Sequence, residues 1–131
     1  MTEVAELLRQ LVAINSVSFI SNRPVIEFAK AQLPWPATEF PYVDGNGVEK
    51  VNCVFGEPDA RLALVCHTDT VPFDEMLSAG CDGEKVFGRG SCDTKGFLAA
   101  AIIALGRAGA RPSDVSLVLT ADDEIGCLGA K

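Results

Sequence analysis

The sequence has few or none of the features on which several classes of protein depend. Its 131 residues include one histidine, one tyrosine and one tryptophan. No apolar run approaches the roughly 18 residues that a membrane span needs. The N-terminal sequence MTEVAELLRQ has early acidic residues and no basic segment followed by an apolar one, which argues against a secretory signal peptide. We therefore expect a soluble, cytoplasmic protein.

Basic residues are too few for a protein that binds nucleic acid. The 11 Lys and Arg residues stand against 18 Asp and Glu, which gives a net charge of −7. Binding to nucleic acid or to an anionic membrane depends on clustered positive charge, so we expect neither partner. A site built from several carboxylates would leave such an acidic balance, although a solvated acidic surface is the commoner cause.

The cysteines form no recognisable framework. There are five of them, an odd number, and no CxxC pair. Neither a disulfide scaffold nor a thiolate zinc site is therefore predicted. We expect most of these residues to be small buried side chains in a reducing compartment. They are Cys53, Cys66, Cys81, Cys92 and Cys127.

The first part of the chain has the pattern of two helices and a hairpin. Residues 3–14 repeat apolar positions at helical spacing after Thr2, a candidate N-cap. A second helix is expected to start near residue 21 or 22, with Pro24 in its first turn, and to end before Pro34. The strand-like residues 37–43 and 48–55 flank the turn sequence DGNG, which predicts a hairpin.

The second part has the pattern of an α/β domain. LALVC, residues 62–66, and VSLVLTA, residues 115–121, are almost continuously apolar, as strands covered on both faces are. Between them, residues 97–108 are apolar on most sides and predict a deeply packed helix. At this length the chain can bury a core as a single domain.

Polar side chains follow three of the strand-like segments. LALVC, VFGRGSC and VSLVLTA are each followed by such residues, and ligands of parallel α/β sheets bind beyond the carboxyl ends of the strands. The crevice would receive one imidazole and five carboxylates. These residues are His67, Asp69, Asp93, Asp122, Asp123 and Glu124.

Five carboxylates in one crevice require a compensating cation, because like charges a few ångströms apart repel or become protonated. Imidazole with carboxylates suits zinc, and the surplus of carboxylates suggests two ions about 3.5 to 4 Å apart. The residues alone leave simpler interpretations open. His67 could be a hydrogen-bonded histidine, Asp93 a helix N-cap, and residues 122–124 a solvated first helical turn. Gly88 and Gly90 could be turn residues, since GRG lacks the spacing of a phosphate-binding loop.

Three motifs resemble those of the M20 family of zinc-dependent peptidases and deacylases. They are HTDTVP at residues 67–72, GRGSCDTKGFLAA at residues 88–100 and TADDEIGCLGAK at residues 120–131. They occur in the family's order, and the resemblance spans essentially the whole chain. Within the family, GRGSCDTKGFLAA and EIGCLGAK are most similar to the members that deacetylate acetylornithine.

The resemblance implies an α/β fold of the zinc-dependent exopeptidase type. This fold has three layers, α/β/α, around a central, largely parallel, mixed sheet. Residues 1–131 would be the N-terminal portion of the catalytic domain, without its C-terminal part and without the dimerisation or lid domain. The helix expected to open after Glu124 is cut short at Lys131, which we interpret as truncation.

The resemblance also assigns roles to residues. His67 would ligate one zinc ion, Asp93 would bridge two, and Glu124 would ligate the second, with cobalt able to substitute. Asp69 would hold the His67 imidazole in the tautomer that metal binding needs. Asp123 would be the general base that takes a proton from the metal-bridging water. Family members have a cis peptide after the bridging aspartate, which predicts one between Asp93 and Thr94.

The implied activity is metal-dependent hydrolysis of the amide bond of a small N-acyl amino acid. N-acetylornithine would give ornithine and acetate, a step of arginine biosynthesis, and the full-length enzyme would be a homodimer. The alternatives are a succinyl-diaminopimelate desuccinylase, a carboxypeptidase-like hydrolase and a catalytically inactive fragment.

Two departures from the family's pattern bear on activity. The family's base is glutamate, and Asp123 is shorter by one methylene, so we expect slower turnover while metal binding persists. The family completes its site with a further downstream carboxylate and histidine, and His67 is the only histidine here. We expect the 131 residues alone to bind zinc weakly at best and to give no meaningful hydrolysis.

Overall fold

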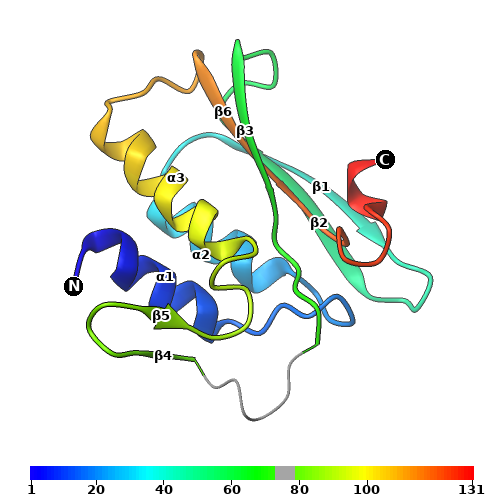
Figure 1. Cartoon of the computed structure of the whole chain (residues 1–131). Coiled ribbons are helices and arrows are strands. Elements are labelled where there is room, and N and C mark those ends of the chain that lie inside the picture. Colours follow the sequence, from blue (N-terminus) through cyan, green and yellow to red (C-terminus); the bar gives the residue numbers. More distant parts are fainter. Residues whose placement is uncertain (73–78) are drawn as a thin grey trace.

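In the part of the chain that the structure describes, a mixed sheet packs against three α-helices (Figure 1). The structure is a computed structural model, and it describes residues 1–72 and 79–131. A separate two-stranded sheet lies before the third helix. The elements in chain order are α1 (Glu3–Ala13), α2 (Arg23–Gln32), β1 (Ala37–Val43), β2 (Glu49–Phe55), β3 (Leu62–His67), β4 (Gly80–Cys81), β5 (Val86–Phe87), α3 (Lys95–Arg107), β6 (Val115–Thr120) and the 3-10 turn η2 (Leu128–Ala130).

The two N-terminal helices form where the sequence predicts them. The side chain of Thr2 caps α1 by accepting a hydrogen bond from the N–H of Ala5 at 3.2 Å. Helix α2 carries Pro24 in its first turn, where the missing N–H costs nothing, and ends before Pro34. Among the described residues, no helix combines the length and apolar character of a membrane span.

The main sheet has the strand order β1-β2-β6-β3. The predicted hairpin is confirmed, because β1 and β2 pair antiparallel, and β2 also pairs antiparallel with β6. Strands β3 and β6 pair parallel, which places His67 opposite Thr120. The predicted α/β fold with a mixed sheet is confirmed. Its parallel pair is formed by two of the three segments whose ends carry the predicted site.

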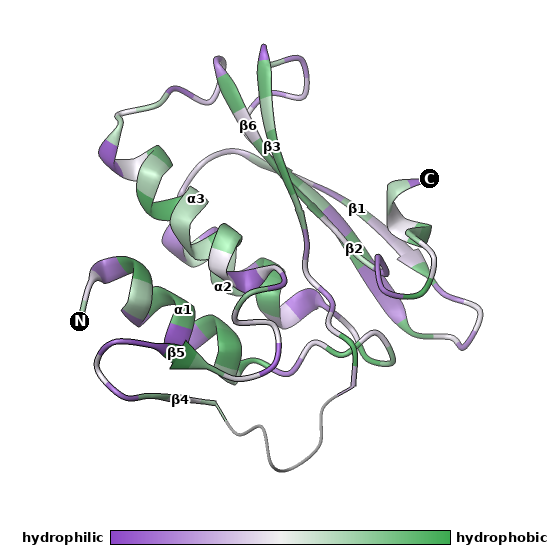
Figure 2. Cartoon of the chain, viewed as in Figure 1, coloured by the Kyte–Doolittle hydropathy of each residue, from purple (hydrophilic) through white to green (hydrophobic). Residues whose placement is uncertain are grey.

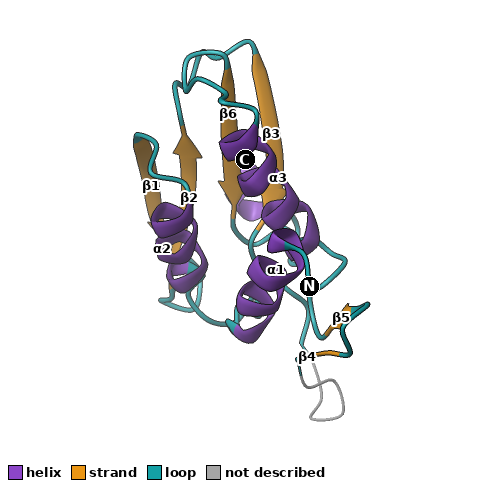
Figure 3. Ribbon diagram, turned by 90° about the vertical axis from the view of Figure 1, so that its left-hand side faces the viewer, coloured by secondary structure: helices purple, strands orange, loops and turns teal. Residues whose placement is uncertain are grey.

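The three helices lie on one side of the main sheet (Figures 1 and 3). They bury one face of β2 and β6, and the strands most apolar in Figure 2 are β3 and β6. The described residues form no second helical layer of the predicted three-layer arrangement; on the other face, η2 contacts β2. The core includes Leu11, Ile26, Val51, Phe55, Leu98, Ile102, Leu117 and Leu119.

Strand β3 is less covered than its apolar sequence predicts. Leu62 and Val65 are 55% and 57% exposed, so the expectation that LALVC is buried on both faces is wrong within the described residues. The reason is that β3 lies at the edge of the sheet with β6 as its described neighbour, and the helices cover only one face of the sheet. Helix α3 is packed as predicted, with Leu98, Ala99 and Ile102 buried, although it begins at Lys95 rather than at residue 97.

Two other expectations are also wrong. No α-helix follows Glu124, because Gly126 and Cys127 have positive φ angles of 106° and 55°, and only η2 forms after them. The expectation that most cysteines are buried is wrong, because only Cys53 and Cys66 of the five are buried. Cys92 and Cys127 are exposed and Cys81 is half-buried.

Candidate metal centre

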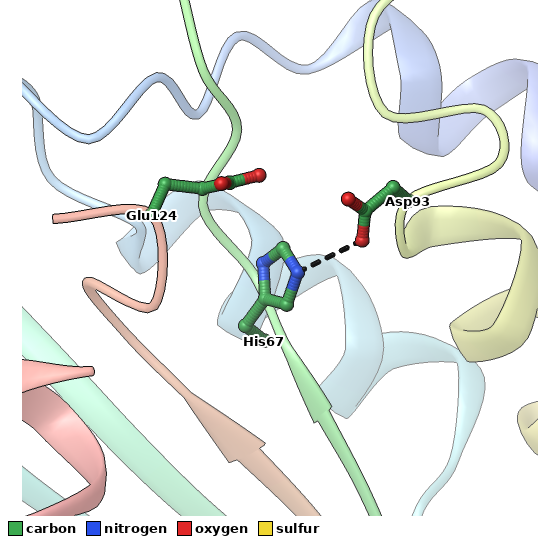
Figure 4. Close-up of side chains that lie close together, drawn as sticks. All are labelled: His67, Asp93 and Glu124. Carbon is green, nitrogen blue, oxygen red and sulfur yellow. Dashed lines mark hydrogen bonds and ion pairs between the residues drawn. The ribbon is translucent and has the colours of Figure 1, made fainter. Parts of the chain in front are cut away.

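Three segments bring His67, Asp93 and Glu124 together (Figure 4). One ligand atom from each residue lies within 4.8 Å of the others. His67 is the last residue of β3, Asp93 lies in the loop before α3, and Glu124 follows β6. The parallel pairing of β3 and β6 explains the meeting of His67 and Glu124, because both strands end at the same edge of the sheet.

The His67 ring is held by one nitrogen and presents the other to the site. Its Nδ1 lies 2.8 Å from the carbonyl oxygen of Asp69 and 3.4 Å from its carboxylate Oδ1. Both atoms are acceptors, so Nδ1 carries a proton. The Nε2 atom lies 3.1 Å from Asp93 Oδ1 and 3.9 Å from Asp123 Oδ2. With Nδ1 held in this way, Nε2 is the ring nitrogen that can bind a metal ion once its own proton is displaced.

Asp69 is a buried acceptor with donors on both oxygens. Its Oδ2 accepts from the Ser18 hydroxyl at 2.6 Å and from the Glu124 N–H at 3.2 Å. Its Oδ1 accepts from the Asp123 N–H at 3.0 Å. Burial alone would raise the pKa of Asp69, but the hydrogen bonds from His67, Ser18 and these two N–H groups outweigh it and lower the pKa to about 2. Asp69 therefore fixes both the imidazole and the segment that carries Glu124.

The carboxylates around the imidazole change its acidity. Hydrogen bonds to Asp69 raise the pKa of His67, and a hydrogen bond to Asp93 adds to this rise. Burial opposes it, and the resulting pKa is about 9. Without a metal ion, the ring is therefore an imidazolium that donates toward both carboxylates at neutral pH. A divalent cation bound at this point would replace the Nε2 proton.

Asp93 and Asp123, by contrast, are open to solvent. Their side chains are 73% and 43% exposed. Asp123 Oδ1 accepts a hydrogen bond from the Cys127 thiol at 3.2 Å, and its Oδ2 faces the imidazole. The expected cis peptide is present between Asp93 and Thr94. The alternative that Asp93 is the N-cap of α3 is excluded, because Thr94 occupies that position.

The loop that carries Asp93 is fixed by glycines and by α3. Gly88 and Gly90 have φ angles of 135° and 82°, and a Cβ on Gly90 would lie 2.9 Å from the Thr70 methyl group. The Thr94 hydroxyl donates to the His67 carbonyl at 2.8 Å, which ties the start of α3 to the end of β3. A cavity of about 200 Å³ beside the ligands is lined by Val71, Gly88, Arg89, Gly90, Ser91, Cys92, Asp93 and Glu124.

Asp122 does not join the other acids of the predicted cluster. It is fully buried and forms an ion pair with Lys50, whose Nζ lies 2.9 Å from Asp122 Oδ1. Its Oδ2 accepts from the Tyr42 hydroxyl at 2.7 Å. The expectation of five carboxylates in one crevice is therefore wrong for Asp122. Sequence reasoning also missed Lys50 and Tyr42, which it treated as ordinary strand residues.

The residues present fit a divalent metal ion. One imidazole nitrogen and two carboxylates converge, and the imidazole carries its proton on the far nitrogen. Nitrogen and oxygen donors of this kind suit zinc and its neighbours in the first transition series. These three residues, His67, Asp93 and Glu124, are the ones that the sequence predicts as ligands.

Comparison with known proteins identifies a matching family and relatives that are similar in sequence. The model of "Peptidase family M20/M25/M40" matches residues 63–131. Acetylornithine deacetylase of Myxococcus xanthus is 41% identical over 95% of this chain and 36% of its own length. Succinyl-diaminopimelate desuccinylase of Rhizorhabdus wittichii is 32% identical over 86% of this chain and 27% of its own length. The chain thus spans about a third of the length of these curated relatives.

A solved structure supports the fold independently. The Zn-dependent exopeptidase of Parabacteroides distasonis superposes with a TM-score of 0.62 at 14% identity, over 90% of this chain and 45% of its own. At such low identity the similarity concerns the fold alone. The family model covers more than half of the chain, including His67, Asp93 and Glu124, and the protein therefore belongs to the M20/M25/M40 peptidase family.

Proposed function

We propose that residues 1–131 are the N-terminal portion of the catalytic domain of a zinc-dependent amide hydrolase acting on N-acyl amino acids. The observation that supports this most is the convergence of His67, Asp93 and Glu124 within 4.8 Å at the end of two parallel strands. The family relationship agrees with it. The rest of the catalytic domain and the dimerisation domain would lie outside these residues, and the complete enzyme would be a homodimer.

Each residue of the site has a proposed role. His67 Nε2 and the Glu124 carboxylate would each ligate one of two zinc ions, and Asp93 would bridge them. When bound, zinc polarises the amide carbonyl and lowers the pKa of water. The remaining ligands, including a second imidazole, would come from outside the chain, because His67 is its only histidine.

Asp123 is the proposed general base. Its Oδ2 lies 3.9 Å from His67 Nε2, on the side of the ring where Asp93 also lies. It would take a proton from the attacking water while the acyl carbon gains a C–O bond. It would then give this proton to the amine nitrogen as the C–N bond breaks, which leaves a carboxylic acid and an amine. Transfer of the acid's proton to the amine gives the carboxylate and the ammonium ion. Asp69 would keep the imidazole in place throughout.

The most specific substrate we propose is N-acetylornithine, which would give ornithine and acetate in arginine biosynthesis. The 41% identity with the Myxococcus xanthus acetylornithine deacetylase favours it. A second candidate is N-succinyl-diaminopimelate, which the 32% identity with a desuccinylase favours.

A chimeric enzyme tests the proposal. This chain would replace the matching N-terminal segment of the Myxococcus xanthus deacetylase, and the product would be assayed for zinc content and for hydrolysis of both N-acyl substrates. We expect two zinc ions per subunit and a measurable release of ornithine. The matched control is the chimera with His67→Ala, which should fold and assemble but lose both properties. A well-folded chimera that binds no zinc would refute the proposal.

The isolated chain gives a second test. Because it lacks the full ligand set, we expect weak zinc binding and no meaningful hydrolysis from the 131 residues alone. Calorimetry that found tight uptake of two zinc ions by this polypeptide would contradict the proposed need for outside ligands.

A further inference from the structure

A buried ion pair lies next to the candidate site. The side chains of Lys50 and Asp122 are 1% and 0% exposed, and Lys50 Nζ lies 2.9 Å from Asp122 Oδ1. The second oxygen of Asp122 accepts from the Tyr42 hydroxyl at 2.7 Å. Lys50 is on β2, Tyr42 on β1, and Asp122 directly precedes Asp123 and Glu124.

Such a pair is weak support for stability. Removing two charges from water is costly, and well-packed apolar residues in the same place are often at least as stabilising. Two buried charges are therefore better explained by a requirement for specific geometry. The contacts of Lys50 and Asp122 indicate which geometry that is.

Lys50 also binds the segment that holds Asp69. Its Nζ donates to the carbonyl oxygens of Ser18 at 2.5 Å and Ile20 at 2.9 Å. The hydroxyl of the same Ser18 donates to Asp69 Oδ2 at 2.6 Å. A single ammonium group is therefore two contacts away from the carboxylate that orients His67.

Asp122 fixes the segment on the opposite side of Asp69. Its φ angle of 60° is left-handed, a conformation that aspartate tolerates better than most residues. The chain turns sharply there after β6. The N–H groups of the next two residues, Asp123 and Glu124, then donate to Asp69 Oδ1 and Oδ2 at 3.0 and 3.2 Å.

We propose that Lys50 is a positioning residue of the metal centre. Through Asp122 it sets the path of residues 123–124, and through Ser18 it sets the carboxylate of Asp69. It thereby holds the Glu124 side chain and the His67 imidazole in the relative positions that metal binding needs. This inference rests on the proposed function, because it assumes that these two residues bind metal.

The experiment replaces both charges of the pair. Asp44, whose Oδ2 lies 3.9 Å from Lys50 Nζ, keeps its hydrogen bonds from the N–H groups of Asn46 and Val48 in the variant. The variant Lys50→Met with Asp122→Asn keeps the approximate volume of both side chains and an acceptor for Tyr42. Its matched control is Arg111→Met with Asp114→Asn, which removes an exposed ion pair of 2.7 Å outside the site. Circular dichroism establishes that each variant is folded.

The single histidine makes the readout specific. Nuclear magnetic resonance of the imidazole in the 131-residue chain needs no assignment, because His67 is the only histidine. In the wild-type chain and the control we expect a protected Nδ1 proton and a shift of the ring signals on zinc addition. In the Lys50/Asp122 variant we expect rapid exchange of that proton and a zinc affinity about tenfold or more weaker, as for other changes behind a ligand.

The outcomes separate this inference from the proposed function. A folded variant with an unchanged Nδ1 proton and a zinc affinity within twofold of wild type would show that the pair is merely structural. If the wild-type ring does not respond to zinc, zinc binding by the chimera decides about the proposed metal site, while the Nδ1 proton of the metal-free chain still decides about Lys50. If the double variant does not fold, Ser18→Ala decides instead. It removes the hydroxyl that donates to Asp69 and keeps the carbonyl that Lys50 contacts, and unchanged signals there would overturn the proposed route from Lys50 through Ser18.

Discussion

The aspartates around the site fall into two pairs that are held differently. Asp69 and Asp122 are buried, and every carboxylate oxygen in this pair faces at least one protein donor. Asp93 and Asp123 are 73% and 43% exposed, and each has an oxygen directed toward the imidazole. The buried pair therefore has its oxygens committed to the protein. The exposed pair keeps oxygens available for an ion or for a proton.

The comparison shows how one sheet edge can carry many acids without mutual repulsion. Lys50 compensates Asp122, and donors from Ser18, His67 and two backbone N–H groups compensate Asp69. Only the exposed acids, together with Glu124, then need a cation. Changes in the exposed pair should alter metal binding or turnover with little effect on the free energy of unfolding. Changes in the buried pair should alter both the site and the free energy of unfolding.

The largest expected effect is on metal binding by Asp93→Asn. A proposed bridging ligand is lost, so the zinc affinity of the chimera should fall more than about a hundredfold. This exceeds the loss of affinity that is usual when a residue hydrogen-bonded to a ligand is changed. Because Asp93 is exposed, the free energy of unfolding without metal should change by less than about 0.5 kcal/mol. Chelator competition and chemical denaturation measure the two quantities. A stability loss of several kcal/mol would remove the distinction between the pairs.

The next effect concerns the length of the proposed base. Asp123→Glu in the chimera should raise kcat, because the carboxylate gains about one bond length of reach, and misplacement on the order of 1 Å can cost around a hundredfold. Zinc affinity should stay the same, since the base is not a ligand. Steady-state kinetics on N-acetylornithine measure the change. Equal kcat values for the two forms would mean that reach does not limit the reaction.

Asp69→Asn should affect both binding and stability. Zinc affinity should fall about tenfold to a hundredfold, because His67 loses its orienting partner. The pKa of Asp69 is lowered to about 2, below its ordinary value of about 3.9 in the unfolded chain. Its contribution to stability is therefore present above about pH 4 and is lost as the pH falls toward about 2.

Denaturation of the metal-free chain between about pH 7 and pH 2 tests this sign. The stability advantage of wild type over Asp69→Asn should be on the order of 2 kcal/mol near neutral pH and should shrink below about pH 4. A difference that stays constant down to about pH 2 would show that the carboxylate is not held by these hydrogen bonds.

The smallest effect is expected outside both pairs. Arg111→Met removes an ion pair with Asp114 in which the side chains are 75% and 49% exposed. Exposed pairs of this kind contribute about 0 to 1 kcal/mol, so unfolding and the His67 ring signals should be nearly unchanged. A large change in the ring signals would mean that the site responds to charge at the surface generally.

The sequence predicts the candidate metal ligands better than it predicts the buried pair of Lys50 and Asp122. His67, Asp93 and Glu124 were recognisable because each follows a strand-like or glycine-containing segment, and parallel strands end at one edge. The elements α1, α2 and the β1–β2 hairpin were likewise visible in local periodicity and turn residues. These features depend on neighbours in the chain.

The roles of Lys50 and Asp122 depend on contacts far apart in the chain. From the sequence, Lys50 cannot be distinguished from a solvent-facing lysine that alternates with the apolar Val51 along β2. Asp122 looks the same as Asp123, and only the left-handed turn at Asp122 sends the two side chains to different places. The exposure of β3 was also hidden, because an apolar run does not state which strands flank it.

The exposed thiols described above have a practical consequence for every titration. Cys92 adjoins Asp93 in the chain, and the Cys127 sulfur lies 3.2 Å from Asp123. Soft sulfur ligands take up zinc readily, so a fraction of the cation added to this chain would be captured by sulfur rather than by imidazole. Serine at positions 92 and 127 would remove that competition, and affinities measured in such a background would belong to the nitrogen and oxygen donors alone.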